Sequence, residues 1–358
     1  MRKIRRILLC ILLAVVVTDN IAYQRRFPCA SSNDIAMGID PENMWNTTEG
    51  SHLTNEDPDA RENVWPNGMR RSRAQMETKR PFHVLVLGCS FTFGVGLDDD
   101  KTYVWRLNEL MPVVEFDNGA VGGYGPLQCL IRQRRLMKFK KYDCVIYSYI
   151  NDHFERGSIP KFRISNGHER VGNDVEMPRR DVYVLPYTEL NSKFEFIDHK
   201  LHRYYFPGAS LSPLSNLLGN YCGVFEVKHQ RQPQENEQYM IFASQVNRMA
   251  QVAAAYGSKF LLISLDGTRV NDLARNYSPL VTYFDNRFYK DFDRTDLIRQ
   301  DSRNHPGPEV NDYWARKLAN YLERTEVFGE LINHCECPEY PNHRRLYDLE
   351  HQPVTWPW

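Results

Sequence analysis

The chain has 358 residues, which is enough for one large domain or two domains of ordinary size. Hydrophobic residues make up 42% of it and aromatic residues 12%, so a sizeable core can be buried. Its 45 Lys and Arg residues balance 45 Asp and Glu residues, which excludes a bulk electrostatic attraction to nucleic acid. Two basic clusters, at residues 70–73 and 132–141, are expected to be solvated surface.

The N-terminus carries the pattern of an export signal. Basic residues between Arg2 and Arg6 precede a short apolar run from Ile7 to Val17, and polar residues follow. The run is shorter than the roughly 20 residues that a bilayer-spanning helix needs. Residues 1–22 are therefore predicted to be a signal peptide or an uncleaved, membrane-embedded signal anchor, with a buried N-terminal helix as the alternative. Either kind of signal predicts an extracytoplasmic body, on the periplasmic or secretory side of a membrane.

The cysteines bear on redox state and on metal binding. Three lie in or beside apolar runs and are expected to be buried thiols: Cys89, Cys129 and Cys144. Four others are disulfide candidates in an exported chain, with their pairing left open: Cys29, Cys222, Cys335 and Cys337. The segment from His334 to Cys337 lacks a second ligand pair at zinc spacing. We therefore expect no metal and no cofactor.

Strands and helices alternate along the middle of the chain. The polar segment 23–80 has little periodicity and is predicted to be an irregular arm. Short apolar runs then predict strands at residues 83–87, 113–116, 143–150, 259–265 and 279–284. Helices are predicted at residues 103–111, 126–142, 234–256 and 309–324. Such alternation indicates an α/β domain with a parallel sheet and helices on both faces.

The predicted domain spans residues 81–330. Residues 155–235 lose the alternation and are interpreted as an insertion that covers the sheet edge. Residues 331–358, rich in Pro, Tyr and Trp, are predicted to be a tail that runs over the surface.

Polar residues follow three of the predicted strands, and a fourth set precedes the last helix. Ser90 follows the first strand, a glycine-rich loop with Gly123 follows the second, and Asn151 follows the third. His305 stands just before the last helix. Because the carboxyl ends of parallel strands lie at one edge of a sheet, these distant points can converge.

These residue types suit acyl transfer. A serine hydroxyl can attack a carbonyl carbon when a base such as His305 takes its proton. The oxyanion that forms needs preorganised donors, and the amide of Asn151 with the N–H groups of Ser90 and a glycine would supply three. A carboxylate would orient the imidazole. Taken singly, each residue also has an ordinary structural explanation as a helix cap, a turn or a loop residue.

Four short blocks occur in the order in which SGNH/GDSL hydrolases carry theirs, and the chain resembles that family over about residues 82–152 and 301–319. The blocks are Gly88-Cys89-Ser90-Phe91-Thr92-Phe93-Gly94, Asn118 to Gly125, Asn151-Asp152, and His305-Pro306. The resemblance is greatest to bacterial-type members with an N-terminal membrane segment. Each block alone is weak, but the ordered set on predicted strand ends is specific.

The resemblance implies a flavodoxin-like three-layer α/β/α sandwich with a mostly parallel sheet. It also implies ester hydrolysis or acyl transfer without a metal. By the same resemblance, Ser90 is the nucleophile, Gly123 and Asn151 complete the oxyanion hole, and His305 is the base.

The chain departs from the family pattern at two points. Cys89 occupies the position of the usual Asp before the nucleophile, and a nucleophilic Cys89 is the rival hypothesis. The acid that usually lies two or three residues before the His is replaced, and the nearest acid is Asp301, four residues before His305. Either Asp301 reaches the imidazole by a different loop path, or Ser90 and His305 act as a dyad with a carbonyl group as orienter.

The sequence thus predicts a serine esterase that acts on an O-acyl ester through an acyl-Ser90 intermediate. The substrate is expected to be a small-molecule or glycan ester, and the extracytoplasmic location favours a cell-surface glycan. Two alternatives stay open: a polysaccharide O-acyltransferase that uses the same site, and a catalytically inactive binding protein that keeps the cleft.

Overall fold

The computed structural model describes residues 37–40, 42–47, 49–53, 60–76, 78–160, 162–171, 175–204, 232–266, 277–287 and 305–325. The predicted signal segment, the four disulfide candidates, Asp301 and the predicted tail lie outside these residues. Among the described helices, none combines the length and the apolar character needed to cross a membrane.

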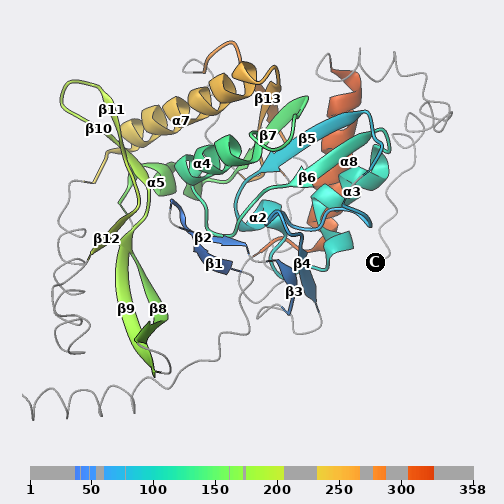
Figure 1. The fold of residues 1–358 in the computed structure, drawn as a ribbon. Coiled ribbons are helices and arrows are strands. Elements are labelled where there is room, and N and C mark those ends of the chain that lie inside the picture. Colours follow the sequence, from blue (N-terminus) through green and yellow to red (C-terminus); the bar gives the residue numbers. More distant parts are fainter. Residues whose placement is uncertain are drawn as a thin grey trace, which may run out of the picture.

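Five parallel strands form the central sheet (Figure 1). They are β5 (Phe82–Leu87), β6 (Val114–Asn118), β7 (Cys144–Tyr149), β13 (Lys259–Ser264) and β14 (Thr282–Asp285). Their spatial order is β14-β13-β7-β5-β6. Counted along the chain this is the order 2-1-3-4-5 of flavodoxin-like folds. The central strands are apolar on both faces because helices cover both, as buried parallel strands require.

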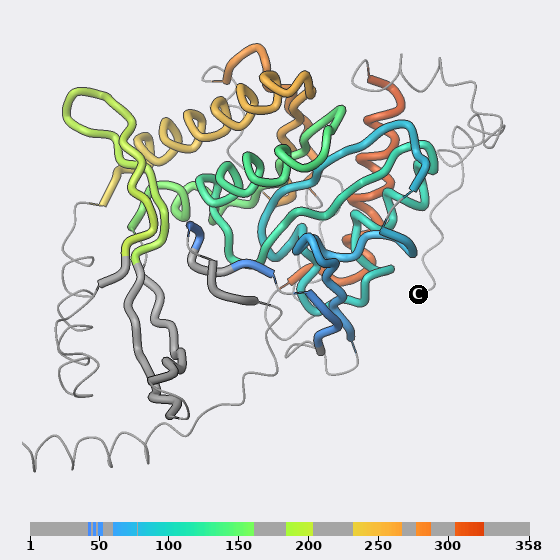
Figure 2. The backbone as a smooth tube through the Cα atoms, in the orientation of Figure 1, coloured from blue at the N-terminus to red at the C-terminus, as the bar shows by residue number. Residues whose placement is uncertain are grey.

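The helices follow the strands and make two outer layers. They are α2 (Ser90–Phe93), α3 (Tyr103–Leu110), α4 (Pro126–Leu136), α5 (Asp152–Ser158), α7 (Glu235–Ala255) and α8 (Pro308–Arg324), with a short 3₁₀ helix η2 (Asp99–Lys101). Helices α3 and α8 pack on one face of the sheet, whereas α4 and α7 pack on the other (Figure 2). The predicted three-layer α/β/α arrangement is confirmed.

Two hydrophobic clusters hold the layers together. One lies between the sheet and the α3–α8 layer, where the predicted stripe of α8 from Val310 to Leu322 is fully buried. The other lies between the sheet and the α4–α7 layer. The expected helix over residues 126–142 ends early, at Leu136. Tyr142 instead enters the core, where its hydroxyl donates to Asp117 at 3.1 Å.

Residues 37–76 differ from the irregular arm that we expected. They form two antiparallel hairpins, β1 (Met37–Asp40) with β2 (Met44–Thr47) and β3 (Gly50–Leu53) with β4 (Arg61–Val64). Beyond β4, the N–H of Arg70 donates to the Asn118 carbonyl at 3.0 Å and the Ser72 hydroxyl donates to the Phe116 carbonyl at 2.8 Å. These bonds cover the open edge of β6, which would otherwise offer unpaired backbone groups to other chains.

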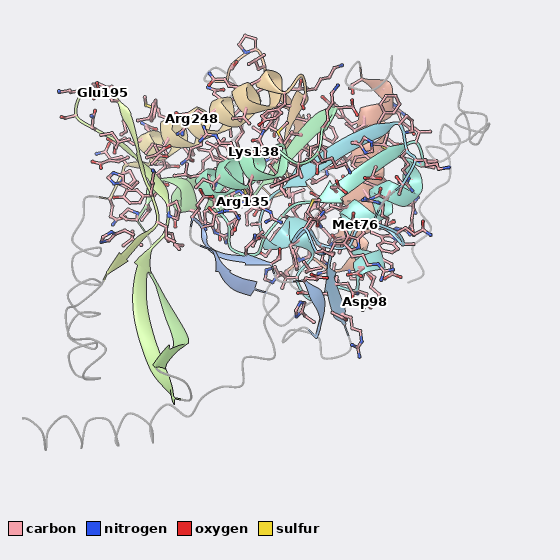
Figure 3. The ribbon with its side chains drawn as sticks, in the orientation of Figure 1. Met76, Asp98, Arg135, Lys138, Glu195 and Arg248 are labelled. Carbon is pink, nitrogen blue, oxygen red and sulfur yellow. The ribbon has the colours of Figure 1, made fainter. Side chains whose placement is uncertain are left out.

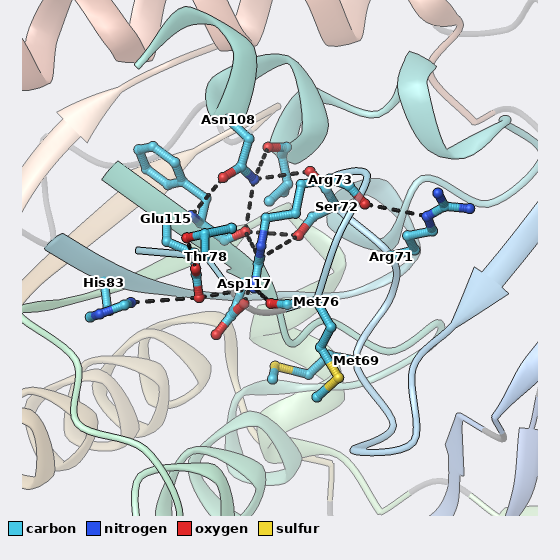
Figure 4. A network of polar contacts seen from close by, with 12 residues as sticks. Met69, Arg71, Ser72, Arg73, Met76, Thr78, His83, Asn108, Glu115 and Asp117 are labelled. Atoms are coloured by element: carbon cyan, nitrogen blue, oxygen red, sulfur yellow. Dashed lines mark hydrogen bonds and ion pairs between the residues drawn. The ribbon is translucent and has the colours of Figure 1, made fainter. Parts of the chain in front are cut away.

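The expectation that the cluster at residues 70–73 is solvated surface is wrong. The side chains of Arg70 and Arg73 are buried, and each forms ion pairs with carboxylates inside the fold. The Arg70 guanidinium lies 3.1 Å from Asp99. Arg73 lies 2.9 Å from Glu115 and 2.8 Å from Asp117, inside the polar network of Figure 4.

The predicted insertion at residues 155–235 begins within α5, and its strands follow that helix. Strands β8 (Phe162–Val171), β9 (Val175–Val184) and β12 (His202–Tyr204) form one antiparallel sheet, and β10 (Tyr187–Leu190) pairs with β11 (Phe196–His199). The β10–β11 hairpin is anchored to α7: Arg248 donates to Asp198 at 2.7 Å, and the Gln245 amide donates to Thr188 at 2.8 Å. Figure 3 shows Arg248 on α7 and Glu195 at the far end of this hairpin.

Candidate active site

Two neighbouring strands place Ser90 and Asn151 at the same edge of the sheet. Strands β5 and β7 pair in register, with Leu87 opposite Tyr147. Ser90 comes three residues after β5 ends, and Asn151 comes two residues after β7 ends. Both residues therefore leave the sheet at its carboxyl edge, where ligands bind in open α/β folds.

A tight turn sets the position of Ser90. At Gly88 a side chain would overlap Thr92 and would come within 2.9 Å of the Ser148 carbonyl oxygen, so only glycine lets the chain turn here. Ser90 is the first residue of α2, and its side chain is partly exposed. The hydroxyl is thus presented at the sheet edge on a short, fixed helical turn.

The glycine-rich loop after β6 is fastened against the Ser90 turn. The side-chain amide of Asn118 donates to the Thr92 carbonyl at 2.9 Å, and the Val121 N–H donates to the Gly88 carbonyl at 3.2 Å. Gly123 then adopts a φ of +76°, a left-handed conformation that favours glycine. The loop with Gly123 consequently lies beside the turn that carries Ser90.

Asn151 is held through its backbone. Its N–H donates to the Asp266 carboxylate at 2.9 Å, and Asp266 follows the next strand, β13. The side chain of Asn151 is exposed, and within the described part of the chain it caps no helix N–H group. Its amide group is available to a ligand at the sheet edge.

His305 lies close to the residue that follows Ser90. Its ring meets the Phe91 ring edge-on, with centroids 5.7 Å apart, and Phe91 in turn stacks on Trp314 of α8 at 6.3 Å. The segment after His305 is fixed by Asn311. The amide of Asn311 donates to the carbonyls of Pro306 at 3.2 Å and Gly307 at 2.9 Å, while its oxygen accepts the Tyr103 N–H at 3.0 Å.

Cys89 is a packed thiol. Its side chain is 1% exposed and belongs to the core cluster under α3 and α8. Burial raises the pKa of the Cys89 thiol, and the charge of Asp266 adds to the rise. Because only a thiolate is a good nucleophile, this environment disfavours the rival hypothesis of a nucleophilic Cys89. Cys129 and Cys144 are likewise buried and free, as expected.

The structure thus brings four of the five predicted site residues to one edge of the sheet: Ser90, Gly123, Asn151 and His305. Asp301 lies outside the described residues, and the catalytic roles of all five stay predictions. Among the described residues, no group of three potential metal ligands comes together.

Three contributors were not anticipated: Asp266, Asn311 and Arg156. Arg156 donates to Asp152 at 2.8 Å and to the Tyr124 carbonyl at 3.4 Å, which ties α5 to the glycine-rich loop. Only Asp266 carried a signal in the sequence, because it directly follows a predicted strand, as Ser90 and Asn151 do. Asn311 and Arg156 are ordinary helix residues, and each has a partner far away in the sequence, Tyr103 and Tyr124, that no local pattern indicates.

Comparisons with known proteins find likeness only in structure. No protein-family model matches the chain, and no curated protein matches it. The structure of TesA is 14% identical over 67% of this chain and 98% of that chain, with a TM-score of 0.37. The esterase EstA from Pseudoalteromonas sp. is 11% identical over 70% of this chain and 98% of that chain, with a TM-score of 0.36.

A third structure, of the acetylxylan esterase Axe2 from Geobacillus stearothermophilus, is 12% identical over 70% of this chain and 98% of that chain, with a TM-score of 0.37. Likeness at this level assigns no activity to the chain. The function proposed below therefore rests on the geometry of the described residues.

Proposed function

We propose that the chain is a serine esterase that cleaves an O-acyl ester through an acyl-Ser90 intermediate. The observation that carries the proposal is the convergence at one sheet edge of a serine on a tight turn, a glycine loop, an unengaged amide and a histidine. Ser90, Gly123 and Asn151 follow three adjacent parallel strands, and His305 is packed on the neighbour of Ser90.

The mechanism follows from these positions. The Ser90 hydroxyl oxygen attacks the ester carbonyl carbon while His305 takes the hydroxyl proton. The oxyanion accepts hydrogen bonds from the N–H groups of Ser90 and Gly123 and from the Asn151 amide. The C–O bond to the alcohol then breaks, and His305 gives its proton to the leaving oxygen. Water then attacks the acyl carbon while His305 takes its proton, the bond from that carbon to the Ser90 oxygen breaks, and His305 returns the proton to that oxygen as the carboxylic acid leaves.

The substrate class is proposed from context. The basic and apolar pattern of residues 1–22 supports an extracytoplasmic body that is secreted or membrane-anchored, where O-acylated glycans are accessible. The same acyl-enzyme would act as an O-acyltransferase if a sugar hydroxyl replaced water in the second step. The predicted insertion at residues 155–235 begins within α5, close to Asn151, and would influence which acceptor arrives.

Covalent labelling of Ser90 tests the proposal. The full-length chain in mild detergent is treated with a fluorophosphonate, and the modified peptide is identified by mass spectrometry. We expect one adduct, on Ser90, that is absent from Ser90→Ala and undiminished in Ser51→Ala, an exposed serine elsewhere. Hydrolysis of p-nitrophenyl acetate should fall by at least about 10³-fold in Ser90→Ala.

The same experiment separates the alternatives. If wild type and Ser90→Ala are equally inert towards the probe, the ester and a glycan acceptor, the chain is not an acyl-transfer enzyme and the inactive binding protein is favoured. Faster release of p-nitrophenol in the presence of a glycan acceptor, with acylated glycan as product, would identify transfer.

A further inference from the structure

Asp266 occupies a strand end next to the proposed oxyanion position. Strand β13 lies beside β7 with Ser264 opposite Tyr149, so Asp266 and Asn151 emerge from the sheet at the same height. The Asp266 carboxylate accepts the Asn151 N–H at 2.9 Å. A carboxyl group from the neighbouring strand therefore fixes the backbone of the residue whose side chain is proposed to hold the oxyanion.

The setting of Asp266 differs from that of an ordinary structural carboxylate. It is partly buried, and within the described part of the chain no Lys, Arg or His forms an ion pair with it. Asp285 ends the next strand, β14, and is paired with Arg287 at 2.6 Å. Within the described part of the chain, two equivalent strand ends thus carry one acid paired with a cation and one acid whose hydrogen bonds come from backbone N–H groups.

Within the described part of the chain, three charged or titratable groups on other elements interact electrostatically with Asp266. From α5, Asp152 disfavours its negative charge, whereas Arg156 favours it. Arg156 is itself bonded to Asp152 at 2.8 Å, which limits its help to Asp266. Cys89 lies in the turn before α2, directly before Ser90. The negative charge of Asp266 raises the pKa of the Cys89 thiol, so this charge acts electrostatically on the turn that carries Ser90.

Burial is the largest influence on Asp266 and raises the pKa of its carboxyl to about 7, against the opposing hydrogen bond from Asn151. The group therefore changes charge in the neutral range. In its neutral form it still offers an oxygen to the Asn151 N–H. In its ionised form it adds a negative charge beside the position where an oxyanion would form.

We propose that Asp266 is a positioning residue of the ester site, which fixes Asn151 through its carboxyl oxygen and lowers the turnover when it ionises. The inference rests on the proposed function and adds a regulation of that site by pH. The positioning arises from the acceptor oxygen and the regulation arises from the charge, so substitutions can separate the two.

The test compares Asp266→Ala and Asp266→Asn with wild type in the full-length chain, with p-nitrophenyl acetate between pH 5.5 and 9. Asp266→Ala loses the acceptor, so kcat should fall by about tenfold near pH 6 while KM changes little, as expected for a misplaced oxyanion donor. At pH 8.5 the loss relative to wild type should be smaller, because this variant also lacks the charge. Hydrogen exchange of the Asn151 amide should become faster in this variant.

Asp266→Asn keeps an acceptor oxygen and removes the charge. Its kcat should equal that of wild type near pH 6, and it should exceed wild type by at least about threefold at pH 8.5, where wild-type activity declines. Asp285→Asn, at the neighbouring strand end, should leave the shape of the wild-type pH profile unchanged. Asp266→Asn also serves if Asp266→Ala does not fold.

The outcomes are distinct. The inference is overturned if wild type is active and both Asp266 variants show the same pH profile and the same Asn151 hydrogen exchange as wild type. This result would leave the proposed esterase function intact. A wild type that neither hydrolyses esters nor accepts the fluorophosphonate on Ser90 overturns the proposed function and this inference with it.

Discussion

Two of the regions in which acidic side chains are shielded from water have different surroundings. On the edge strand β6, Glu115 and Asp117 meet Arg73 and Lys140 (Figure 4). Burial alone would raise the pKa of Glu115, but bonds from Lys140 and Thr78 with the charge of Arg73 hold this pKa below its usual value. At the carboxyl edge, Asp266 accepts hydrogen bonds from backbone N–H groups and forms no ion pair with a described residue, and burial raises its pKa.

Neighbouring cations distinguish the carboxylates of β6, which stabilise the fold, from Asp266, whose pKa lies near neutral pH. The β6 network binds the segment at residues 70–73 to the sheet, and the lowered pKa of Glu115 keeps that carboxylate ionised at neutral pH. A site that changes charge near neutral pH needs the opposite arrangement, in which burial is not offset by a cation. Substitutions in the two regions should therefore have different consequences.

The largest effect on stability is expected in the β6 network. Arg73→Met leaves Glu115 and Asp117 buried with Lys140 as the main remaining cation, so the free energy of unfolding should fall by about 3 kcal/mol. Urea denaturation at pH 7 measures this loss. The control is Arg71→Met, since Arg71 is only partly buried and lies over the Trp105 ring at 5.8 Å; it should lose less than about 1 kcal/mol.

The pH dependence sharpens the same prediction. The folded pKa of Glu115 lies below its unfolded value, so its stabilising effect is present above the unfolded pKa and is lost as pH falls through the folded pKa. The difference between wild type and Arg73→Met should accordingly shrink in acid. A difference that stays constant from pH 7 to pH 3 would contradict the ionic origin of the stabilisation.

Asp266→Asn should change stability by a smaller amount than Arg73→Met and in the opposite direction, as a gain at high pH. The folded pKa of Asp266 is raised to about 7, so the folded protein holds the proton more tightly than the unfolded chain. Wild-type stability should therefore fall as pH rises from about 4 to about 7, and the variant should lack this slope.

Thermal unfolding of both proteins at pH 4.5 and pH 8 measures the slope. Relative to wild type, Asp266→Asn should gain on the order of 1 kcal/mol between the two conditions. Asp100→Asn, which removes an exposed carboxylate on η2, controls for the change in net charge. Equal slopes in all three proteins would refute the contrast between the two regions.

The smallest effect is expected at the contact that positions His305. Phe91→Leu removes the edge-on ring contact but keeps an apolar side chain under the imidazole. We expect a loss of kcat of about threefold with little change in KM, since aromatic pairs contribute only about 1 kcal/mol. Phe139→Leu, at a side chain that is 84% exposed, should leave the kinetics unchanged. Equal kcat values in the two variants would show that Phe91 does not position His305.

The sheet and its carboxyl edge could be predicted from the sequence because both depend on local patterns. Apolar runs before Ser90 and Asn151 mark buried strands, and the alternation with helices makes those strands parallel. Convergence then follows from the fold class, without any knowledge of side-chain contacts.

The buried basic cluster could not be predicted in this way. Arg70 and Arg73 resemble surface residues until their partners are known, and those partners lie on η2 and β6. The end of α4 at Leu136 was not predicted either, and beyond it the phenol of Tyr142 lies in the core and donates to Asp117. Asp266 was missed for another reason: its strand end was recognised, but no motif marked the acid as part of the site.

The attachment of α8 has a consequence for how activity arises. Asn311 ties the segment of His305 to the first residue of α3, so the imidazole reaches the sheet edge only when α8 has docked. His305 follows Ser90 by 215 residues in the sequence (305 minus 90). A chain that is still emerging from the ribosome therefore carries the proposed nucleophile long before its base. If the proposed function holds, such a chain cannot cleave esters until folding is nearly complete.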